Sequence, residues 1–398
     1  ALRAVACDLE ARQEEVLAAN ARDYQAGRAT GLSEALLDRL LLTPERLAGM
    51  AEEVRDVAML PDPVGEEFDG RVLPNGLRVA RRRVPLGVIG AIYESRPNVT
   101  VDIASLCLKS GNGCLLRGGK EAIRSNTVLA RIVQEAVQAQ GVPEGAVQLV
   151  TNTDRALVAE MLKMRDVIDL LVPRGGSELI RYVAENAAMP VVTGGIGVCH
   201  TYVDATAEVE MAVAIVDNAK CRRPTICNAL DTLLVHRQVA AAFLAAIGRR
   251  WAEAGVEMRC DPQALAFLRR SVGASGQTPL QLAPAAEDDF GQEFLALVAA
   301  VKVVDSLDEA LAHIERYGSG HSEAIVTQDY GAAMRFLAQV DAAAVYVNAS
   351  TQFTDGGQFG LGAEVGISTQ KMHARGPMGL RELTSYKWVI MGSGQTRP

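Results

Sequence analysis

The sequence predicts an α/β fold in which parallel strands alternate with helices, and three observations support this prediction. Between residues 84 and 186, short apolar runs alternate with segments of helical periodicity. A second alternating stretch begins near residue 205. The 398 residues are 49% hydrophobic and 22% charged, which is typical of a globular protein with two or three domains. Because helices that alternate with strands cover both faces of a parallel sheet, we expect layered α/β domains.

The predicted elements follow the chain in order. Residues 1–60 have a helical pattern, with Thr43-Pro44-Glu45 as a helix start, and Pro74-Asn75-Gly76 between two β-prone runs predicts a hairpin. In the first stretch we expect strands at 84–93, 114–117, 147–150 and 168–172, and helices at 99–109, 125–139, 156–163 and 176–186. In the second we expect helices at 209–219, 239–254 and 307–316, strands at 232–235, 299–304, 323–327 and 344–348, a loop at 271–284, a glycine-rich segment at 355–366 and a last strand near 383–391.

Charge, hydropathy and cysteine content exclude several classes of protein. Acids outnumber bases 48 to 40, which argues against a nucleic-acid-binding surface over the whole protein. The longest apolar run, Leu295 to Val301, is far below a membrane span, and no secretory signal opens the chain. The seven cysteines include no C-x-x-C and no cluster with zinc-ligand spacing. We therefore expect a cytoplasmic protein with reduced thiols and no metal, nucleic-acid or membrane partner.

Two glycine-rich loops follow predicted strands and carry cations. One is Arg117-Gly118-Gly119-Lys120, and the other is Pro173-Arg174-Gly175-Gly176-Ser177, which opens a helix. Glycines free backbone N–H groups for an anion, and a helix N-terminus favours negative charge. Either loop alone is compatible with an ordinary strand-to-helix turn, but two such loops favour a phosphorylated ligand.

A thiol nucleophile is the second candidate feature. Cys221 and Cys227 lie near Lys220, Arg222 and Arg223, and nearby positive charge favours a thiolate. Both cysteines are equally compatible with small buried residues, and the residues themselves do not choose between the two thiols.

Among the histidines, His313 is expected to be structural because its neighbours on a predicted helix are apolar. His200 and His321 lie in or beside glycine-containing loops, where they can face a ligand.

Four segments together resemble the gamma-glutamyl phosphate reductase (glutamate-5-semialdehyde dehydrogenase) family, a branch of the aldehyde dehydrogenase superfamily. They are Val84-Pro85-Leu86-Gly87 through Tyr93-Glu94-Ser95-Arg96-Pro97-Asn98, Leu171-Val172-Pro173-Arg174-Gly175-Gly176, Arg223-Pro224-Thr225-Ile226-Cys227-Asn228-Ala229, and Tyr317-Gly318-Ser319-Gly320-His321-Ser322-Glu323-Ala324. The resemblance covers nearly the whole chain.

This resemblance implies NADPH-dependent reduction of L-glutamyl 5-phosphate to L-glutamate 5-semialdehyde and phosphate, the second step of proline biosynthesis. It implies Cys227 as the nucleophile that forms a thioester, with Cys221 as a bystander, and Asn98 and the backbone N–H of Cys227 as oxyanion donors. It assigns the cofactor to Arg117, Lys120, Gly175, Gly176, Ser177 and Glu293. A lysine at 120, where general aldehyde dehydrogenases have a glutamate, favours a 2′-phosphate and hence NADPH.

The same resemblance implies an architecture and partners. We expect a Rossmann-type cofactor domain (1–204, interrupted by an oligomerisation hairpin at about 66–82), an α/β catalytic domain (205–365) and a C-terminal return with an oligomerisation strand (366–398). Arg96, Arg222, Arg223 and His321 are the candidate substrate contacts. A homodimer or homotetramer and a functional pairing with glutamate 5-kinase are also implied.

Two alternatives remain open from the sequence. One is oxidation of another semialdehyde with NAD(P), and the other is a non-catalytic protein on the same scaffold. General aldehyde dehydrogenases have a general-base glutamate in a Glu-Leu-Gly-Gly segment, whereas the chain has no acid at 192–197. Because that base activates water to hydrolyse a thioester, its absence from this segment favours the reductive reaction.

Overall fold

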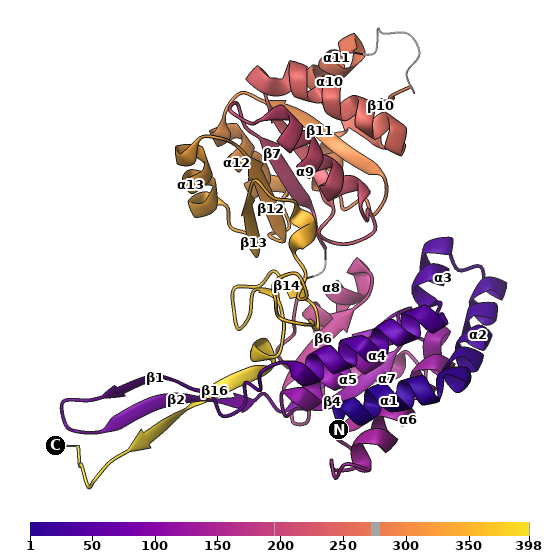
Figure 1. Cartoon of the computed structure of the whole chain (residues 1–398), viewed down its shortest axis with the longest axis vertical. Helices are drawn as coiled ribbons and strands as arrows, with labels where there is room; N and C mark the ends of the chain where they lie inside the picture. The colour runs from indigo at the N-terminus through magenta and orange to yellow at the C-terminus, as the bar shows by residue number, and fades with distance from the viewer. Residues whose placement is uncertain (195, 272–278, 398) are drawn as a thin grey trace. The chain divides into compact units, whose positions relative to one another are not determined.

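A computed structural model describes residues 1–194, 196–271 and 279–397, and these form two compact units (Figure 1). The first unit comprises residues 1–193, 356–366 and those from 377 on, and the second comprises 194–355 and 367–376. The second unit thus begins at Gly194 rather than at the expected residue 205, because the strand at 199–203 belongs to its sheet.

The first unit is built on a parallel sheet with the order β5-β4-β3-β6. Its strands are β3 (Val88–Tyr93), β4 (Gly113–Gly118), β5 (Val147–Leu149) and β6 (Leu170–Arg174). Its helices are α1 (Leu2–Ala11), α2 (Gln13–Ala29), α3 (Glu34–Leu40), α4 (Pro44–Met59), α5 (Asn98–Lys109), α6 (Ile123–Gln138), α7 (Ala156–Met161) and α8 (Ser177–Asn186), with short 3-10 turns η1 (Lys120–Ala122) and η4 (Arg381–Leu383). In the strand register, Tyr93 pairs with both Gly118 and Arg174, so the loops after β3, β4 and β6 leave from one edge of the sheet.

The single strand expected at 84–93 is two strands, β2 (Arg78–Pro85) and β3. Gly87, between them, has a φ of +132°, and a Cβ there would overlap the carboxyl group of Asp169. That carboxylate accepts a hydrogen bond of 2.8 Å from the backbone N–H of Val88. The chain therefore turns at Gly87 and enters a different sheet.

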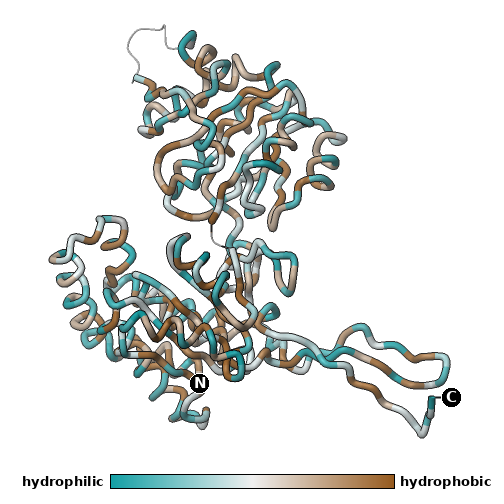
Figure 2. The backbone as a smooth tube through the Cα atoms, turned by 180° about the vertical axis from the view of Figure 1, so that it is seen from behind, coloured by the Kyte–Doolittle hydropathy of each residue, from teal (hydrophilic) through white to brown (hydrophobic). Residues whose placement is uncertain are grey.

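A projecting antiparallel sheet joins the hairpin to the C-terminal strand (Figure 1). Its order is β1-β2-β16, with β1 (Glu67–Val72) and β16 (Thr384–Met391) at the two edges. The hairpin prediction is confirmed, since the backbone N–H of Leu73 donates to the carbonyl of Leu77 across the Asn75-Gly76 turn at 2.8 Å. Hydrophobic residues are interspersed along these strands (Figure 2) and include the exposed side chains Val72, Tyr386, Trp388, Ile390 and Met391.

The second unit is a parallel sheet with the order β10-β9-β11-β8-β7-β12-β13. Its strands are β7 (Cys199–Val203), β8 (Leu230–His236), β9 (Glu257–Cys260), β10 (Gln281–Pro284), β11 (Val298–Val304), β12 (Ser322–Val326) and β13 (Ala344–Val347). The helices are α9 (Val209–Cys221), α10 (Arg237–Ala254), α11 (Pro262–Ser271), α12 (Leu307–Tyr317) and α13 (Tyr330–Gln339), with 3-10 turns η2 (Glu287–Gly291) and η3 (Thr351–Phe353). Short strands β14 (Ile367–Ser368) and β15 (Gly376–Pro377) pair near its end.

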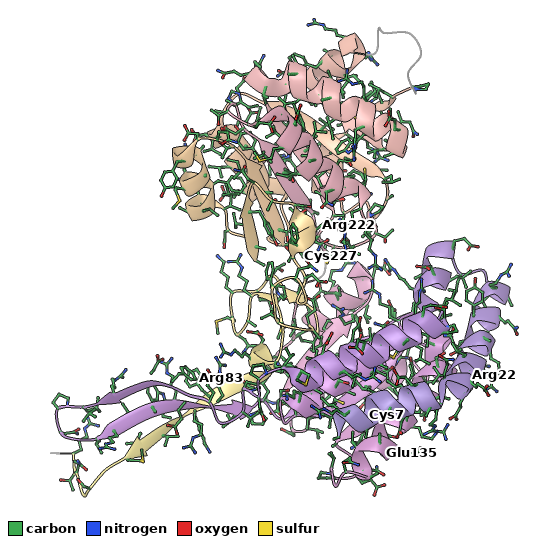
Figure 3. All side chains as sticks on the ribbon, in the orientation of Figure 1. Cys7, Arg22, Arg83, Glu135, Arg222 and Cys227 are labelled. Atoms are coloured by element: carbon green, nitrogen blue, oxygen red, sulfur yellow. The ribbon has the colours of Figure 1, made fainter. Side chains whose placement is uncertain are left out.

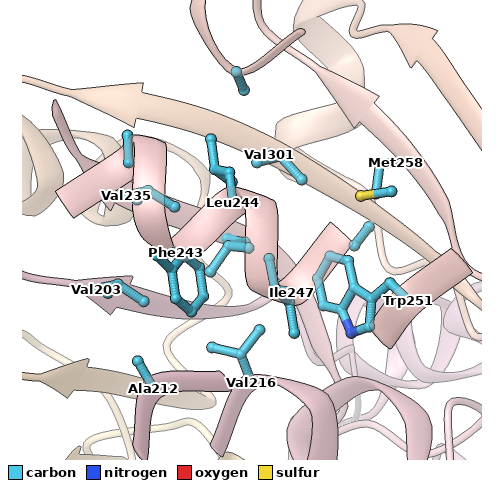
Figure 4. Close-up of a cluster of buried hydrophobic side chains, with 14 of the residues drawn as sticks. Val203, Ala212, Val216, Val235, Phe243, Leu244, Ile247, Trp251, Met258 and Val301 are labelled. Carbon is cyan, nitrogen blue, oxygen red and sulfur yellow. The ribbon is translucent and has the colours of Figure 1, made fainter. Parts of the chain in front are cut away.

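One core cluster of the second unit lies between its sheet and the helices α9 and α10 (Figure 4), and another includes residues of α12 and α13. Phe243, Ile247 and Trp251 on α10 are fully buried against strand residues such as Val203 and Val301. Burying such side chains contributes about 1.5–3 kcal/mol each. None of the described helices has the length and apolar run that crossing a membrane requires.

Several elements of the second unit were not expected. Strand β7 was missed because His200 and Thr201 interrupt its apolar pattern, although both are fully buried. Elements β9, α11 and α13 were also missed, and β10 occupies the end of the loop expected at 271–284. Residues 272–278 of that loop lie outside the described part of the chain.

Candidate active site

The end of β4 and the turn that follows it contain the two cations assigned to the cofactor. The Arg117 side chain is mostly buried, donates from Nη2 to the carbonyl of Thr153 at 3.1 Å, and has a pKa lowered by burial. Lys120 begins η1 and is exposed. Among the residues that the structure describes, Lys120 has no ion-pair partner within 4.0 Å. An exposed ammonium group at the carboxyl edge of the sheet is suited to a ligand phosphate.

The N-terminus of α8 already has an anion. Glu94, in the loop after β3, accepts a hydrogen bond of 3.3 Å from the backbone N–H of Gly176. Its own backbone N–H donates to the carbonyl of Arg174 at 3.0 Å. Thus the carboxylate of Glu94 lies at the helix end where the sequence predicted a phosphate. The side chain of Ser177 is outside the described part of the chain.

Asn98 is the first residue of α5, at the same sheet edge. Its Nδ2 donates to Oδ2 of Asp102, one helical turn further, at 2.8 Å. Burial, together with the charge of Glu53, raises the pKa of Asp102 to about 7, although Asn98, Arg174 and Arg96 oppose this shift. An amide group has two N–H donors, so this bond orients the Asn98 amide and leaves its second donor for another acceptor.

Cys227 lies in the second unit, in the loop between α9 and β8, at the end of the unit where Figure 3 also shows Arg222. The thiol of Cys199 donates to the carbonyl of Cys227 at 3.2 Å. A Cβ at Gly197 would overlap the same carbonyl, so the backbone at 197 packs directly on Cys227. The next residue, Asn228, donates from Nδ2 to the carbonyl of Thr354 at 3.0 Å. The half-buried Cys227 therefore has a fixed backbone.

Cys221 has different surroundings. Burial and the neighbouring carboxylate of Asp217 raise the pKa of its thiol to about 12, although Lys220 and Arg250 oppose this shift. Near neutral pH this thiol is protonated, and the thiolate is the nucleophilic form. The structure thus disfavours Cys221 as a nucleophile, a distinction that the sequence pattern alone did not make.

Lys220 is fully buried and is not available to a ligand. Its Nζ donates to the carbonyl of Leu230 at 2.8 Å and lies 3.7 Å from Oδ1 of Asp231. Asp231 also accepts a hydrogen bond of 3.0 Å from the backbone N–H of Phe294. Burial raises the pKa of Asp231 to about 7 and lowers that of Lys220. The pair therefore anchors the segment next to Glu293 from inside the unit.

Glu293, assigned by resemblance to the cofactor, lies close to the Cys227 loop. Its Oε1 accepts a hydrogen bond of 3.0 Å from the backbone N–H of Gly197, the residue that packs on Cys227. Arg222 and Arg223 are exposed, and Arg222 donates from Nη1 to Oε1 of Gln352 at 3.1 Å. The second unit thus brings Glu293, Cys227 and two exposed cations into one loop cluster.

Three of the five histidines, His200, His313 and His321, are buried. His321 has no exposed surface, its Nδ1 lies 2.8 Å from the hydroxyl of Ser322, and burial lowers its pKa to about 4. His200 lies 3.1 Å from the buried carboxylate of Glu323 rather than facing a ligand. Burial lowers the pKa of His313 to about 3, in line with its structural role. For His321, contact with a substrate remains a prediction.

Several carboxylates that hold these loops were not predicted from the sequence: Glu94, Asp102, Glu121 and, as a buried partner of Lys220, Asp231. For Asp102, the spacing of four residues from Asn98 on a predicted helix was an available signal. For the other three the contacts join segments distant in sequence, and no local pattern points to them.

Comparison with known proteins gives the family. The model of the aldehyde dehydrogenase family matches residues 1–265 and 283–389. The chain belongs to the aldehyde dehydrogenase family. This family uses a nicotinamide cofactor, and its α/β fold agrees with the predicted fold class.

Three relatives within this family are gamma-glutamyl phosphate reductases. The gamma-glutamyl phosphate reductase of Dehalococcoides mccartyi is 60% identical over 397 residues, which are 100% of the chain and 92% of the relative. That of Roseiflexus castenholzii is 58% identical over 399 residues, covering 100% and 93%. The crystal structure of gamma-glutamyl phosphate reductase from Thermotoga maritima matches with a TM-score of 0.95 and 47% identity, covering 100% and 93%. The resemblance inferred from the four sequence segments is confirmed.

Proposed function

We propose that the chain is an enzyme that reduces L-glutamyl 5-phosphate to L-glutamate 5-semialdehyde and phosphate with NADPH, in proline biosynthesis. The observation that supports this most is the 60% identity over full length to a gamma-glutamyl phosphate reductase.

Cys227 is the proposed nucleophile. Its thiolate attacks the acyl carbon, the carbon–oxygen bond to phosphate breaks, and phosphate leaves with the bonding electrons while a thioester forms. Asn98 and the backbone N–H of Cys227 are the proposed donors to the oxyanion. One such donor is worth roughly 10²–10³ in rate. After reduction, the tetrahedral thiohemiacetal takes up a proton and collapses to the aldehyde, which releases the Cys227 thiol.

The residues present fit NADPH as the reductant. Arg117 lies near the end of β4 and the exposed Lys120 follows the strand, where a 2′-phosphate needs positive charge. Gly175, Gly176 and Ser177 are the proposed pyrophosphate loop, and Glu293 is the proposed ribose contact. When bound, the cofactor supplies the hydride. Because Glu94 now occupies the N-terminus of α8, a pyrophosphate there has to displace it or be held by the other loop.

The residues at 192–197 favour a reductase over an aldehyde-oxidising enzyme that hydrolyses its thioester. The segment 192–197 contains no acid that can activate water, although Gly195 within it lies outside the described residues. Oxidation of another semialdehyde with NAD(P) remains the second candidate because it uses the same nucleophile. A non-catalytic role is the third, and an inert Cys227 would support it.

The proposal extends to ligands and partners. Arg96, Arg222, Arg223 and His321 are the proposed contacts of the substrate's phosphate or α-carboxylate. A homodimer or homotetramer is proposed, formed through the exposed apolar residues of β16, and glutamate 5-kinase is the proposed functional partner because it supplies an acyl phosphate. We also propose that the enzyme acts in the cytoplasm, since its cysteines are free thiols.

Paired cysteine variants test the proposal. Cys227→Ala is expected to lower the rate of NADPH-dependent reduction by a factor of about 10³ or more, because the variant lacks the thiol that forms the thioester. Cys221→Ala serves as the matched control and is expected to retain activity, since its thiol is protonated near neutral pH. Steady-state assays at matched folded concentration measure both. Full activity of Cys227→Ala with loss in Cys221→Ala contradicts the assignment.

A further inference from the structure

The loop between β3 and α5 contains a residue with an unusual backbone. Ser95 has a φ of +49°, in the left-handed region that residues other than glycine rarely adopt, and it is nearly fully buried. Three residues later the chain reaches Asn98, the first residue of α5. The conformation of Ser95 therefore sets the direction in which the chain enters the helix that presents Asn98.

One side chain from another loop holds Ser95. Oε1 of Glu121 accepts a hydrogen bond of 2.6 Å from the backbone N–H of Ser95 and one of 3.1 Å from its hydroxyl. Hydrogen bonds to a carboxylate are about twice as strong as neutral ones, so they can offset the strain at Ser95. Glu121 follows Lys120 directly in η1. Its carboxyl group lies so close to Gly119 that a Cβ there would overlap it.

We infer that Glu121 is a positioning residue for the reaction, which aligns Asn98 by holding Ser95 in its left-handed conformation. The inference rests on the proposed role of Asn98 as an oxyanion donor. Glu121 is next to Lys120, the proposed 2′-phosphate contact, so the test has to separate the positioning of Asn98 from a direct contact with the cofactor. A second carboxylate, Glu94, ties the same β3 loop to the loop after β6.

The test separates positioning from folding and from cofactor contact. Glu121→Ala is expected to lower kcat about tenfold or more, because a shift of about 1 Å in a catalytic group can cost about 10²-fold. The KM for NADPH is expected to change by no more than about threefold, because the loss of an interaction made only in the transition state lowers kcat without raising KM. Glu121→Gln keeps an acceptor oxygen and is expected to recover most of kcat. Glu144→Ala, at an exposed glutamate, is the control for an unrelated loss of charge.

A second variant tests the mechanism of the effect. Ser95→Gly removes the strain, because glycine adopts φ of +49° freely. In the Glu121→Ala background it is therefore expected to restore kcat at least partly, although it restores no hydrogen bond. A Glu121→Ala variant with normal kcat overturns the inference, and so does a loss of kcat that Ser95→Gly leaves unchanged. A raised KM for NADPH at normal kcat overturns it as well, since it indicates a direct cofactor contact.

Asn98→Ala distinguishes this inference from the proposed function. If Asn98→Ala lowers kcat and Glu121→Ala causes no further loss in that background, the proposed role of Asn98 and the inference about Glu121 are both supported, because Glu121 then acts through Asn98. If the two losses multiply, Glu121 acts by another route and the inference fails while the function stands. If Asn98→Ala leaves kcat unchanged, the proposed function of Asn98 fails, and this inference fails with it. Melting temperatures of all variants identify any that are simply unfolded.

Discussion

Cys221 and Cys227 are close in sequence and differ in their electrostatic surroundings. The loop was expected to present three cations to a thiol, but Lys220 is turned inward to Asp231 and Leu230. Asp217 lies beside Cys221, whose pKa is raised to about 12. The sequence shows which charged residues are near a cysteine, but it does not show in which direction each charged side chain is oriented. This explains why the residues alone left the choice between the two thiols open.

Asp102 gives the protein a stability that depends on pH. Its pKa is about 7 in the folded state against an ordinary 3.8, with burial and Glu53 raising it and Asn98, Arg174 and Arg96 opposing them. A carboxyl group with a raised pKa binds its proton more tightly in the folded state. The free energy of unfolding is therefore expected to fall as pH rises from about 4 to about 7.

Urea denaturation across this pH range measures the effect, with Asp102→Asn as the variant. The free energy of unfolding of the variant is expected to fall less over this pH range. The remaining fall comes from groups such as Asp231, whose pKa is also raised to about 7. Asp166→Asn, at an exposed carboxylate, is the matched control and is expected to follow the unmodified protein. If the free energy of unfolding depends on pH in the same way in Asp102→Asn and in the unmodified protein, the raised pKa of Asp102 is contradicted.

At the scale of elements, predictions succeeded where a local signal was strong. The Asn75-Gly76 pair predicted the hairpin of β1 and β2, and alternating periodicity predicted most helices and strands. Strand β7 was missed because polar residues interrupt its apolar pattern, and His200 is paired with Glu323, which is distant in sequence. The strand at 84–93 was joined wrongly because the turn at Gly87 depends on Asp169, which is far away in sequence. Local pattern cannot identify such partners.

The Cys227 loop depends on the absence of a side chain at Gly197. A Cβ there would overlap the carbonyl of Cys227, so Gly197→Ala is expected to displace the nucleophile. A displacement of about 1 Å can lower kcat about 10²-fold. Steady-state kinetics measure the loss, with Gly49→Ala as control, because the space around Gly49 in α4 is open. Unchanged kcat in Gly197→Ala would show that the loop tolerates displacement.

At the scale of the whole molecule, the projecting sheet has apolar side chains that a single chain leaves exposed to solvent. Trp388 is 45% exposed and Ile390 is 60% exposed on the edge strand β16. Edge strands with exposed apolar side chains are templates for association. Both residues were expected in an oligomerisation strand near 383–391, and the structure pairs that strand with the hairpin.

Trp388→Lys is expected to weaken self-association, because a central aromatic contact is commonly worth about 2 kcal/mol, or about 30-fold in Kd. Sedimentation velocity over a range of concentrations measures the shift toward smaller species. Val167→Lys changes an exposed apolar residue outside the projecting sheet and is the control. An unmodified protein that is monomeric at all concentrations contradicts the proposed assembly.

Cys227 is proposed to form a thioester which, in the oxidising direction, is cleaved by phosphate and not by water. The most direct measurement runs the reaction in the oxidising direction, with glutamate 5-semialdehyde and NADP⁺ and without phosphate. We predict a single burst of NADPH of about one equivalent per active site, with the acyl group on Cys227 by mass spectrometry. Added phosphate should then start continuous turnover. Continuous turnover without phosphate, or a burst that persists in Cys227→Ala, would contradict the account.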